Sequence, residues 1–121
     1  MAHIFIIDDS PTDVRVFTTL LEKAGHRVSS AVNAEEGTSG VKREMPDLGI
    51  MDVIMPGTNG FPATRDLSRD TQTGHIAILI VTTKSMETDR VWGMRQGAKD
   101  FLTKPVDAKA LLQRIDTLLP G

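Results

Sequence analysis

Short runs of apolar residues alternate along the chain with longer segments in which apolar residues recur at helical spacing. The runs predict five strands, and three of them are nearly unbroken and rich in Ile or Val, which is typical of strands buried on both faces. The runs are IFII (4–7), RVSSAV (27–32), LGIM (48–51), IAILIV (76–81) and DFLT (100–103). Within them, Gly49 would weaken a central strand unless a neighbour packs tightly against its backbone.

The segments between these runs predict five helices. Ser10 and Pro11 are typical of a helix start, because a serine oxygen can accept from free amides and proline suits the first turn, while Gly25 is typical of a helix end. The predicted helices cover residues 11–24, 34–44, 60–69, 86–96 and 107–119. This alternation indicates a five-stranded parallel sheet with helices on both faces, and right-handed crossovers make it a doubly wound α/β fold. A length of 121 residues indicates one domain spanning residues 1–121.

The charge and composition of the chain argue against several classes of function. The 14 basic and 16 acidic residues give a net charge of −2, which argues against a nucleic-acid partner. Cysteine is absent, so disulfides and thiolate metal sites are excluded. The first apolar run is too short for a signal peptide, and no window approaches the roughly 20 apolar residues of a membrane-spanning helix. We therefore expect a soluble cytoplasmic protein without membrane insertion.

Polar side chains follow four of the five predicted strands. They are Asp8 and Asp9 after the first strand, Asp52 after the third, Thr82 and Thr83 after the fourth, and Lys104 after the fifth. Ligands of doubly wound sheets bind beyond the carboxyl ends of the strands, so we expect these side chains to meet at one edge. Taken singly, each has an ordinary structural interpretation: acids that serve a turn or cap, threonines that end a strand, and a lysine in a solvated exit.

The three carboxylates predict a metal site. Carboxylates brought together repel one another, and their pKa values rise unless a cation lies among them. Carboxylate oxygens, water and phosphate oxygens are the ligands that Mg²⁺ prefers. We therefore interpret Asp8, Asp9 and Asp52 as Mg²⁺ ligands, Asp8 directly or through a water molecule. The Ile54 carbonyl, which follows Asp52 in the same loop, is a further candidate ligand.

The same edge predicts phosphoryl chemistry. An aspartate carboxylate can act as a nucleophile and carry a phosphoryl group as an acyl phosphate. Phosphoryl transfer needs alignment and charge neutralisation more than covalent work from the protein. We assign Asp52 as the nucleophile and site of modification. Lys104 would counter the phosphoryl charge, and the Thr82 hydroxyl would donate a hydrogen bond to it.

Four fragments in this order and spacing identify a family. IIDDS, MDVIMPGTNG, IVTTK and FLTKPV resemble the receiver domain of bacterial two-component response regulators, and the similarity covers essentially the whole chain. The resemblance implies a flavodoxin-like fold with strand order 2-1-3-4-5. It also implies that a histidine kinase or a phosphotransfer domain donates a phosphoryl group to Asp52. Finally, it implies a cis peptide bond between Lys104 and Pro105.

The resemblance further implies a switch. Thr82 would move toward the phosphoryl group and Phe101 would turn inward behind it, so that the face of the fourth helix, fifth strand and fifth helix binds a downstream protein. The added charge favours one of two pre-existing arrangements. Phe101 as a simple core aromatic is the alternative. Ile54 and Lys84 should flank the mouth of the site. We interpret Trp92 as a packing residue, with a partner-binding surface as the alternative.

Longer fragments refine the resemblance. DDSPT, MPGTNGFPATRDL and ETDRVWGMRQGAKDFLTKPVD resemble the single-domain regulators of twitching motility, which belong to chemotaxis-like pathways controlling type IV pili. Because the chain ends at Gly121, directly after the last predicted helix, we expect a monomeric stand-alone phospho-acceptor without an output domain. It would catalyse only its own phosphorylation and dephosphorylation, so it would not be an enzyme. A phosphate sink for a shared kinase and a flagellar chemotaxis regulator are the alternatives.

Three other classes of protein fit the sequence less well. A haloacid-dehalogenase-type phosphatase requires a second acid two residues after the nucleophile, where Ile54 lies. A nucleotide-binding fold would show GxxxxGK[ST] or a glycine-rich first turn, and neither is present. A phosphorylation-independent scaffold stays open, although the complete set of acids, threonine and lysine argues against it.

Overall fold

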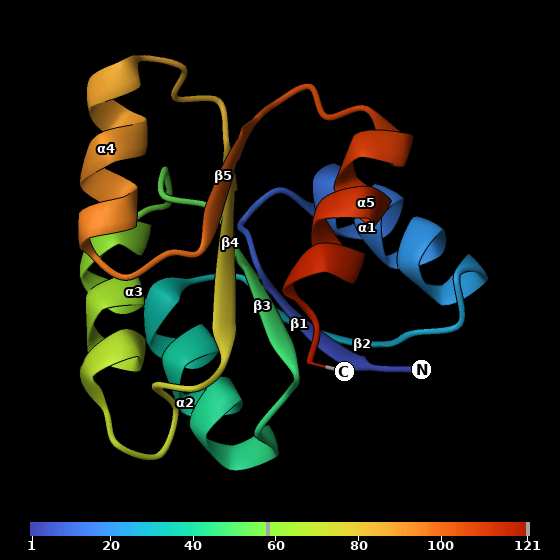
Figure 1. Ribbon diagram of the computed structural model, residues 1–121, viewed down its shortest axis with the longest axis horizontal. Coiled ribbons are helices and arrows are strands. Elements are labelled where there is room, and N and C mark those ends of the chain that lie inside the picture. The colour runs from blue at the N-terminus through green and yellow to red at the C-terminus, as the bar shows by residue number, and fades with distance from the viewer. Residues whose placement is uncertain (58, 121) are drawn as a thin grey trace.

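Five parallel strands form a sheet that lies between two layers of helices (Figure 1). The computed structural model describes residues 1–57 and 59–120; Thr58, which belongs to the fragment MDVIMPGTNG, and Gly121 lie outside the described residues. The elements are β1 (His3–Ile7), α1 (Pro11–Lys23), β2 (Arg27–Ala31), α2 (Ala34–Glu44), β3 (Leu48–Met51), α3 (Gly60–Arg69), β4 (Ala77–Thr82), α4 (Glu87–Arg95), β5 (Asp100–Thr103) and α5 (Ala108–Leu118).

The order of the strands across the sheet is β2-β1-β3-β4-β5, and every neighbouring pair is parallel. The predicted fold class and strand order are therefore confirmed. Each predicted strand and helix is present, and its ends lie within one residue of the prediction. Among the described residues, no helix combines the length and the apolar character that crossing a membrane requires.

Two apolar cores hold the layers together, one on each face of the sheet. Side chains alternate along β1, so that Phe5 and Ile7 face one layer of helices while Ile4 and Ile6 face the other. The first core joins the sheet to α2 and α3 through Val41, Ala63 and Leu67, among others. The second joins it to α1 and α5 through Phe17, Leu21, Leu111 and Ile115. Figure 1 shows α1 and α5 together on one side of the sheet and α2, α3 and α4 on the other.

Local polar contacts set where the helices begin. The side chains of four residues that precede helices accept hydrogen bonds from amides of the first turn, which satisfies donors that have no partner inside the helix. These residues are Ser10 before α1, Asn33 before α2, Asn59 before α3 and Asp107 before α5. After α1 the chain turns at Gly25, whose φ of 93° favours glycine.

Two glycines allow close packing around β3. A Cβ built at Gly49 would lie 2.9 Å from Cδ1 of Ile78 on the neighbouring strand, so a neighbour does pack tightly at this position, as a glycine in a central strand requires. A Cβ at Gly60 would overlap the carbonyl oxygen of Asp52 and lie 2.8 Å from Cα of Val53. The first residue of α3 therefore presses directly on the backbone that leaves β3.

Candidate functional site

The structure brings the three predicted carboxylates together at the carboxyl ends of β1 and β3. One carboxylate oxygen from each of Asp8, Asp9 and Asp52 lies within 4.8 Å of the others. The side chains of Asp8 and Asp52 are buried, whereas Asp9 is exposed. All three potential metal ligands are carboxylate oxygens, and the exposed Asp9 leaves the group open to solvent on one side. This set fits a hard divalent cation that keeps part of its water shell.

Backbone hydrogen bonds hold the two buried acids in place. The amide of Asp52 donates to the Ile7 carbonyl at 2.9 Å, which extends the pairing of β3 with β1 by one residue. The Asp52 carboxylate is oriented in turn, because its Oδ1 accepts from the amide of Ile54 at 3.1 Å. Asp8 Oδ1 accepts from the amide of Ser10 at 2.9 Å. In these contacts Ile54 presents its amide, so its carbonyl as a metal ligand stays a prediction.

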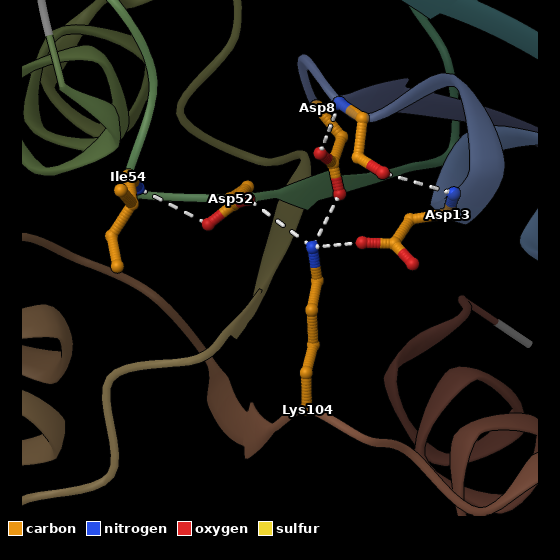
Figure 2. A network of polar contacts seen from close by, with 6 residues as sticks. Asp8, Asp13, Asp52, Ile54 and Lys104 are labelled. Atoms are coloured by element: carbon orange, nitrogen blue, oxygen red, sulfur yellow. Dashed lines mark hydrogen bonds and ion pairs between the residues drawn. The ribbon is translucent and has the colours of Figure 1, made fainter.

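Lys104 reaches across this edge from the end of β5 (Figure 2). Its backbone amide donates to the carbonyl of Thr82 at 2.7 Å, and its Nζ lies 2.8 Å from Oδ2 of Asp8 and 3.2 Å from Oδ2 of Asp52. The peptide bond between Lys104 and Pro105 is cis, as the resemblance implied. The ammonium therefore lies where a phosphoryl group on Asp52 would need a positive charge.

A fourth acid, Asp13, also contacts Lys104, and the sequence analysis missed it. Its Oδ2 lies 2.7 Å from Lys104 Nζ, the shortest of the three carboxylate contacts of that ammonium. Asp13 lies in the first turn of α1. The available signal was an acid three residues after the helix-capping Ser10, which places it near the end of β1.

Thr82 ends β4 and carries a buried hydroxyl that is not satisfied. Among the residues that the structure describes, Thr82 Oγ1 has no hydrogen-bond partner. A buried polar atom without a partner costs free energy, so natural proteins rarely keep one without a reason. The hydroxyl can therefore donate to an acceptor that enters the site beside Lys104.

Burial and nearby charges shift the pKa values of Asp8 and Lys104 in opposing directions. Desolvation raises the pKa of Asp8 above its ordinary value, and the hydrogen bonds from Lys104 and from the Ser10 amide offset only part of this rise. Burial alone would lower the pKa of Lys104. The hydrogen bonds to Asp13 and Asp8 and the charge of Asp52 outweigh it, so the pKa of Lys104 is raised. Lys104 is therefore cationic throughout the physiological range.

Comparison with known proteins decides the family. A model of the response regulator receiver domain matches residues 4–116. This chain belongs to the response regulator receiver family. Over 121 residues the receiver is 53% identical to Protein PilH of Pseudomonas aeruginosa, and the match covers 100% of both chains. It is 36% identical over 117 residues to the response regulator PleD of Caulobacter vibrioides, covering 97% of this chain and 26% of PleD.

Solved structures give the same family. The chemotaxis protein CheY4 of Vibrio cholerae superposes on this receiver with a TM-score of 0.92 at 28% sequence identity, covering 98% of this chain and 99% of that one. The likeness therefore extends over the whole doubly wound fold and includes the edge that carries the acids. The family match, the relative and this superposition together identify the chain as a receiver of phosphorelay response regulators.

The surroundings of the site in this receiver agree with some predictions and overturn one. Phe101 is buried at 8% exposure, which suits both the switch and the core interpretation. The Ile54 side chain is 49% exposed beside Asp52, as expected for the mouth of the site. Lys84 pairs with Asp89 of α4 at 3.5 Å. Trp92 is 50% exposed, so its interpretation as a packing residue is wrong. Of the residues of α4, only Gly93 is buried.

Proposed function

We propose that this receiver accepts a phosphoryl group on Asp52 from a histidine kinase or a phosphotransfer domain. Mg²⁺ would be held by Asp8, Asp9, Asp52 and the Ile54 carbonyl. The observation that carries the proposal is the contact between Lys104 Nζ and Asp52 Oδ2 at 3.2 Å, beside a group of three carboxylates. A buried aspartate flanked by a fixed ammonium and by cation ligands has the parts that phosphoryl transfer requires.

The reaction is a displacement at phosphorus. A carboxylate oxygen of Asp52 attacks the phosphorus of a phosphohistidine; an O–P bond forms, the P–N bond breaks, and the imidazole leaves and takes up a proton. The Ile54 amide orients the nucleophile through Oδ1. Lys104 and the Thr82 hydroxyl then donate hydrogen bonds to the new phosphoryl oxygens. Mg²⁺, when bound, neutralises the charge of the transferring oxygens.

The output of the receiver is a change in partner binding. α4 rests on Phe101, because a Cβ built at Gly93 would lie 3.3 Å from its ring. A movement of Phe101 would therefore change the surface on which α4 packs. This helix and the loop before it expose an apolar set, Met86, Val91, Trp92 and Met94. The α4–β5–α5 face would bind a downstream protein, and the receiver would act as a cytoplasmic monomer without a nucleic-acid partner.

The pathway served would be the chemotaxis-like control of twitching motility through type IV pili. The support is the 53% identity to Protein PilH over the full length of both chains. Restoration of normal twitching in a Pseudomonas aeruginosa strain that lacks PilH tests it, with Asp52→Asn as the control. Twitching left at the level of the deletion strain by the wild-type receiver would contradict it.

Labelling by a small-molecule phosphodonor tests the acceptor role without a kinase. Incubation with acetyl phosphate and Mg²⁺ should add one phosphoryl group to the wild type, measured as intact mass. Chelation of Mg²⁺ or the substitution Asp52→Asn should abolish it. Equal, acid-stable labelling of Asp52→Asn would remove Asp52 as the acceptor.

A further inference from the structure

The start of α1 departs from the usual reciprocal cap. A serine at the N-cap is often paired with an acid three residues later, whose side chain reaches back to the serine amide. Here one half of this pattern is present, because Ser10 Oγ accepts from the amide of Asp13 at 3.2 Å. The other half is absent, because the Ser10 amide donates to Oδ1 of Asp8 at 2.9 Å and not to the Asp13 carboxylate. The carboxylate of Asp13 is thereby released from capping.

The carboxylate of Asp13, which does not cap the helix, contacts Lys104 instead. Asp13 Oδ2 lies 2.7 Å from Lys104 Nζ, from the side opposite Asp52 (Figure 2). A lysine ammonium has three donors, and Asp8, Asp13 and Asp52 together use all of them. The Lys104 side chain is only 10% exposed, so the direction of its ammonium is set by these three acids.

Asp13 differs from the other two partners of Lys104. Asp8 and Asp52 belong to the group of carboxylates that could hold a cation, and Asp52 loses its free carboxylate when it is phosphorylated. Asp13 lies outside that group. Its side chain is 35% exposed, against 2% for Asp8 and 7% for Asp52, so water solvates its charge at little cost. It is therefore the one partner that neither a cation nor the reaction engages.

We propose that Asp13 is a positioning residue for phosphoryl transfer, which anchors the ammonium of Lys104 while the bond from Lys104 to Asp52 passes to a phosphoryl oxygen. This inference rests on the proposed function. Without the anchor, Lys104 keeps its charge but loses its fixed direction, and catalysis by alignment is sensitive to displacements of about 1 Å.

An acid in the first turn also stabilises a helix through the helix dipole, and α2 provides the matched control. Glu36 occupies the same position in α2, where its amide donates to Oδ1 of the N-cap Asn33 at 2.8 Å. It is exposed and is not among the carboxylate partners of Lys104. Glu36→Gln therefore removes the same helix-terminal charge as Asp13→Asn without touching the site.

A double-mutant cycle on the rate of phosphorylation by acetyl phosphate, at saturating Mg²⁺ and followed by intact mass, tests the proposal. Asp13→Asn should slow the wild type roughly ten-fold, and Asp13→Glu should recover part of the loss. Glu36→Gln should stay within about two-fold of the wild type. In a Lys104→Met background, which retains the buried stem, Asp13→Asn should change the remaining rate by less than about two-fold, since the two residues act as one unit.

The outcomes separate the inference from the function it rests on. A wild type that is not labelled would overturn the proposed function and this inference with it. With a labelled wild type, an Asp13→Asn rate equal to that of Glu36→Gln, or above the wild type, would overturn the inference alone. So would an equal loss from Asp13→Asn in the wild-type and Lys104→Met backgrounds, since it would show an effect on α1 rather than on Lys104.

Discussion

Asp8 carries a charge that burial disfavours. Its carboxyl group is buried, and desolvation raises its pKa despite the contact with Lys104. A carboxyl group with a raised pKa binds protons more tightly in the folded state. The free energy of unfolding therefore falls as pH rises from the unfolded pKa, about 3.9, through the folded pKa, and stays lowered above it.

Asp8→Asn should therefore raise the free energy of unfolding at pH 7, because it removes the buried charge and its Oδ1 can still accept from the Ser10 amide. The gain should shrink as pH falls toward 4. It should come with weaker Mg²⁺ binding, seen as a smaller rise of Tm on adding Mg²⁺. Melting curves at several pH values measure both effects.

Asp116→Asn, on the exposed face of α5, is the control for this prediction. An Asp8→Asn protein that melts at a lower temperature than the wild type at pH 7 would contradict the account.

Removal of the Thr82 hydroxyl should affect stability and phosphorylation differently. Thr82→Val keeps the shape of the side chain and removes a buried hydroxyl that has no hydrogen-bond partner within residues 1–57 and 59–120, so the free energy of unfolding should be unchanged or rise by up to about 1 kcal/mol. Phosphorylation of Asp52 should nevertheless slow. Denaturant melts and labelling rates, with Thr103→Val on β5 as control, measure the two effects. A loss of stability above about 1 kcal/mol would show that the hydroxyl has a partner in the folded protein.

At the scale of the elements, the contact between α3 and the loop after β3 sets where Asp52 lies. The chain turns through Pro56 and Gly57, whose φ is 80°, and returns so that Gly60 touches the backbone of Asp52 and Val53. The amide of Gly60 donates to the carbonyl of Val53 at 3.1 Å. The glycine at the start of α3 thus fixes the loop that orients Asp52, the proposed nucleophile.

Gly60→Ala should therefore lower stability and slow the phosphorylation of Asp52, although the new methyl group does not enter the site. The added Cβ would press on backbone, which cannot move as a flexible side chain can, so we expect a loss of stability of about 1–3 kcal/mol and slower phosphorylation. Gly25→Ala is the control, because its positive φ also costs stability but open space surrounds it far from the site. Equal labelling rates for the two variants would contradict the role given to Gly60.

The elements could be predicted closely because their signals are local. Capping side chains, apolar runs and glycines lie within a few residues of the ends that they define, and alternation of strands with helices then places the strand ends at one edge. Asp13 could not be found this way, since its contact with Lys104 joins residues 91 apart. The contact also depends on which acid accepts the hydrogen bond from the Ser10 amide. The exposure of Trp92 agrees with the alternative of a partner-binding surface rather than with the preferred packing role, because helical spacing alone does not tell whether a face of a helix is buried or exposed.

At the scale of the whole molecule, the site and the α4–β5–α5 face are joined by packing contacts through the sheet. Thr82 and Phe101 lie on the neighbouring strands β4 and β5, and α4 covers Phe101 through Gly93. Trp92, the only tryptophan of the chain, directly precedes Gly93 in that helix and is 50% exposed. If the proposed switch passes through α4, we expect a change at Asp52 to alter the fluorescence of Trp92, so that no added label is needed.

Phosphorylation in the presence of Mg²⁺ should change the fluorescence of Trp92, because displacement of α4 alters the half-exposed surroundings of the indole. Phe101→Leu should reduce the change without preventing labelling, since the smaller side chain weakens the contact between α4 and the sheet. Asp52→Asn with acetyl phosphate and Mg²⁺ should show no phosphodonor-dependent change. Identical emission from the phosphorylated and unmodified wild type would contradict a switch that passes through α4.

Chemical trapping of the modified residue tests the central claim most directly. Borohydride reduces an acyl phosphate to an alcohol, so treatment of the labelled wild type should convert residue 52 alone to homoserine, as read by tandem mass spectrometry of its peptides. The yield should follow Mg²⁺ and match the fraction labelled by intact mass. Homoserine at another aspartate, or a phosphoryl group retained elsewhere while residue 52 stays unmodified, would contradict the assignment of Asp52 as the phosphoryl acceptor.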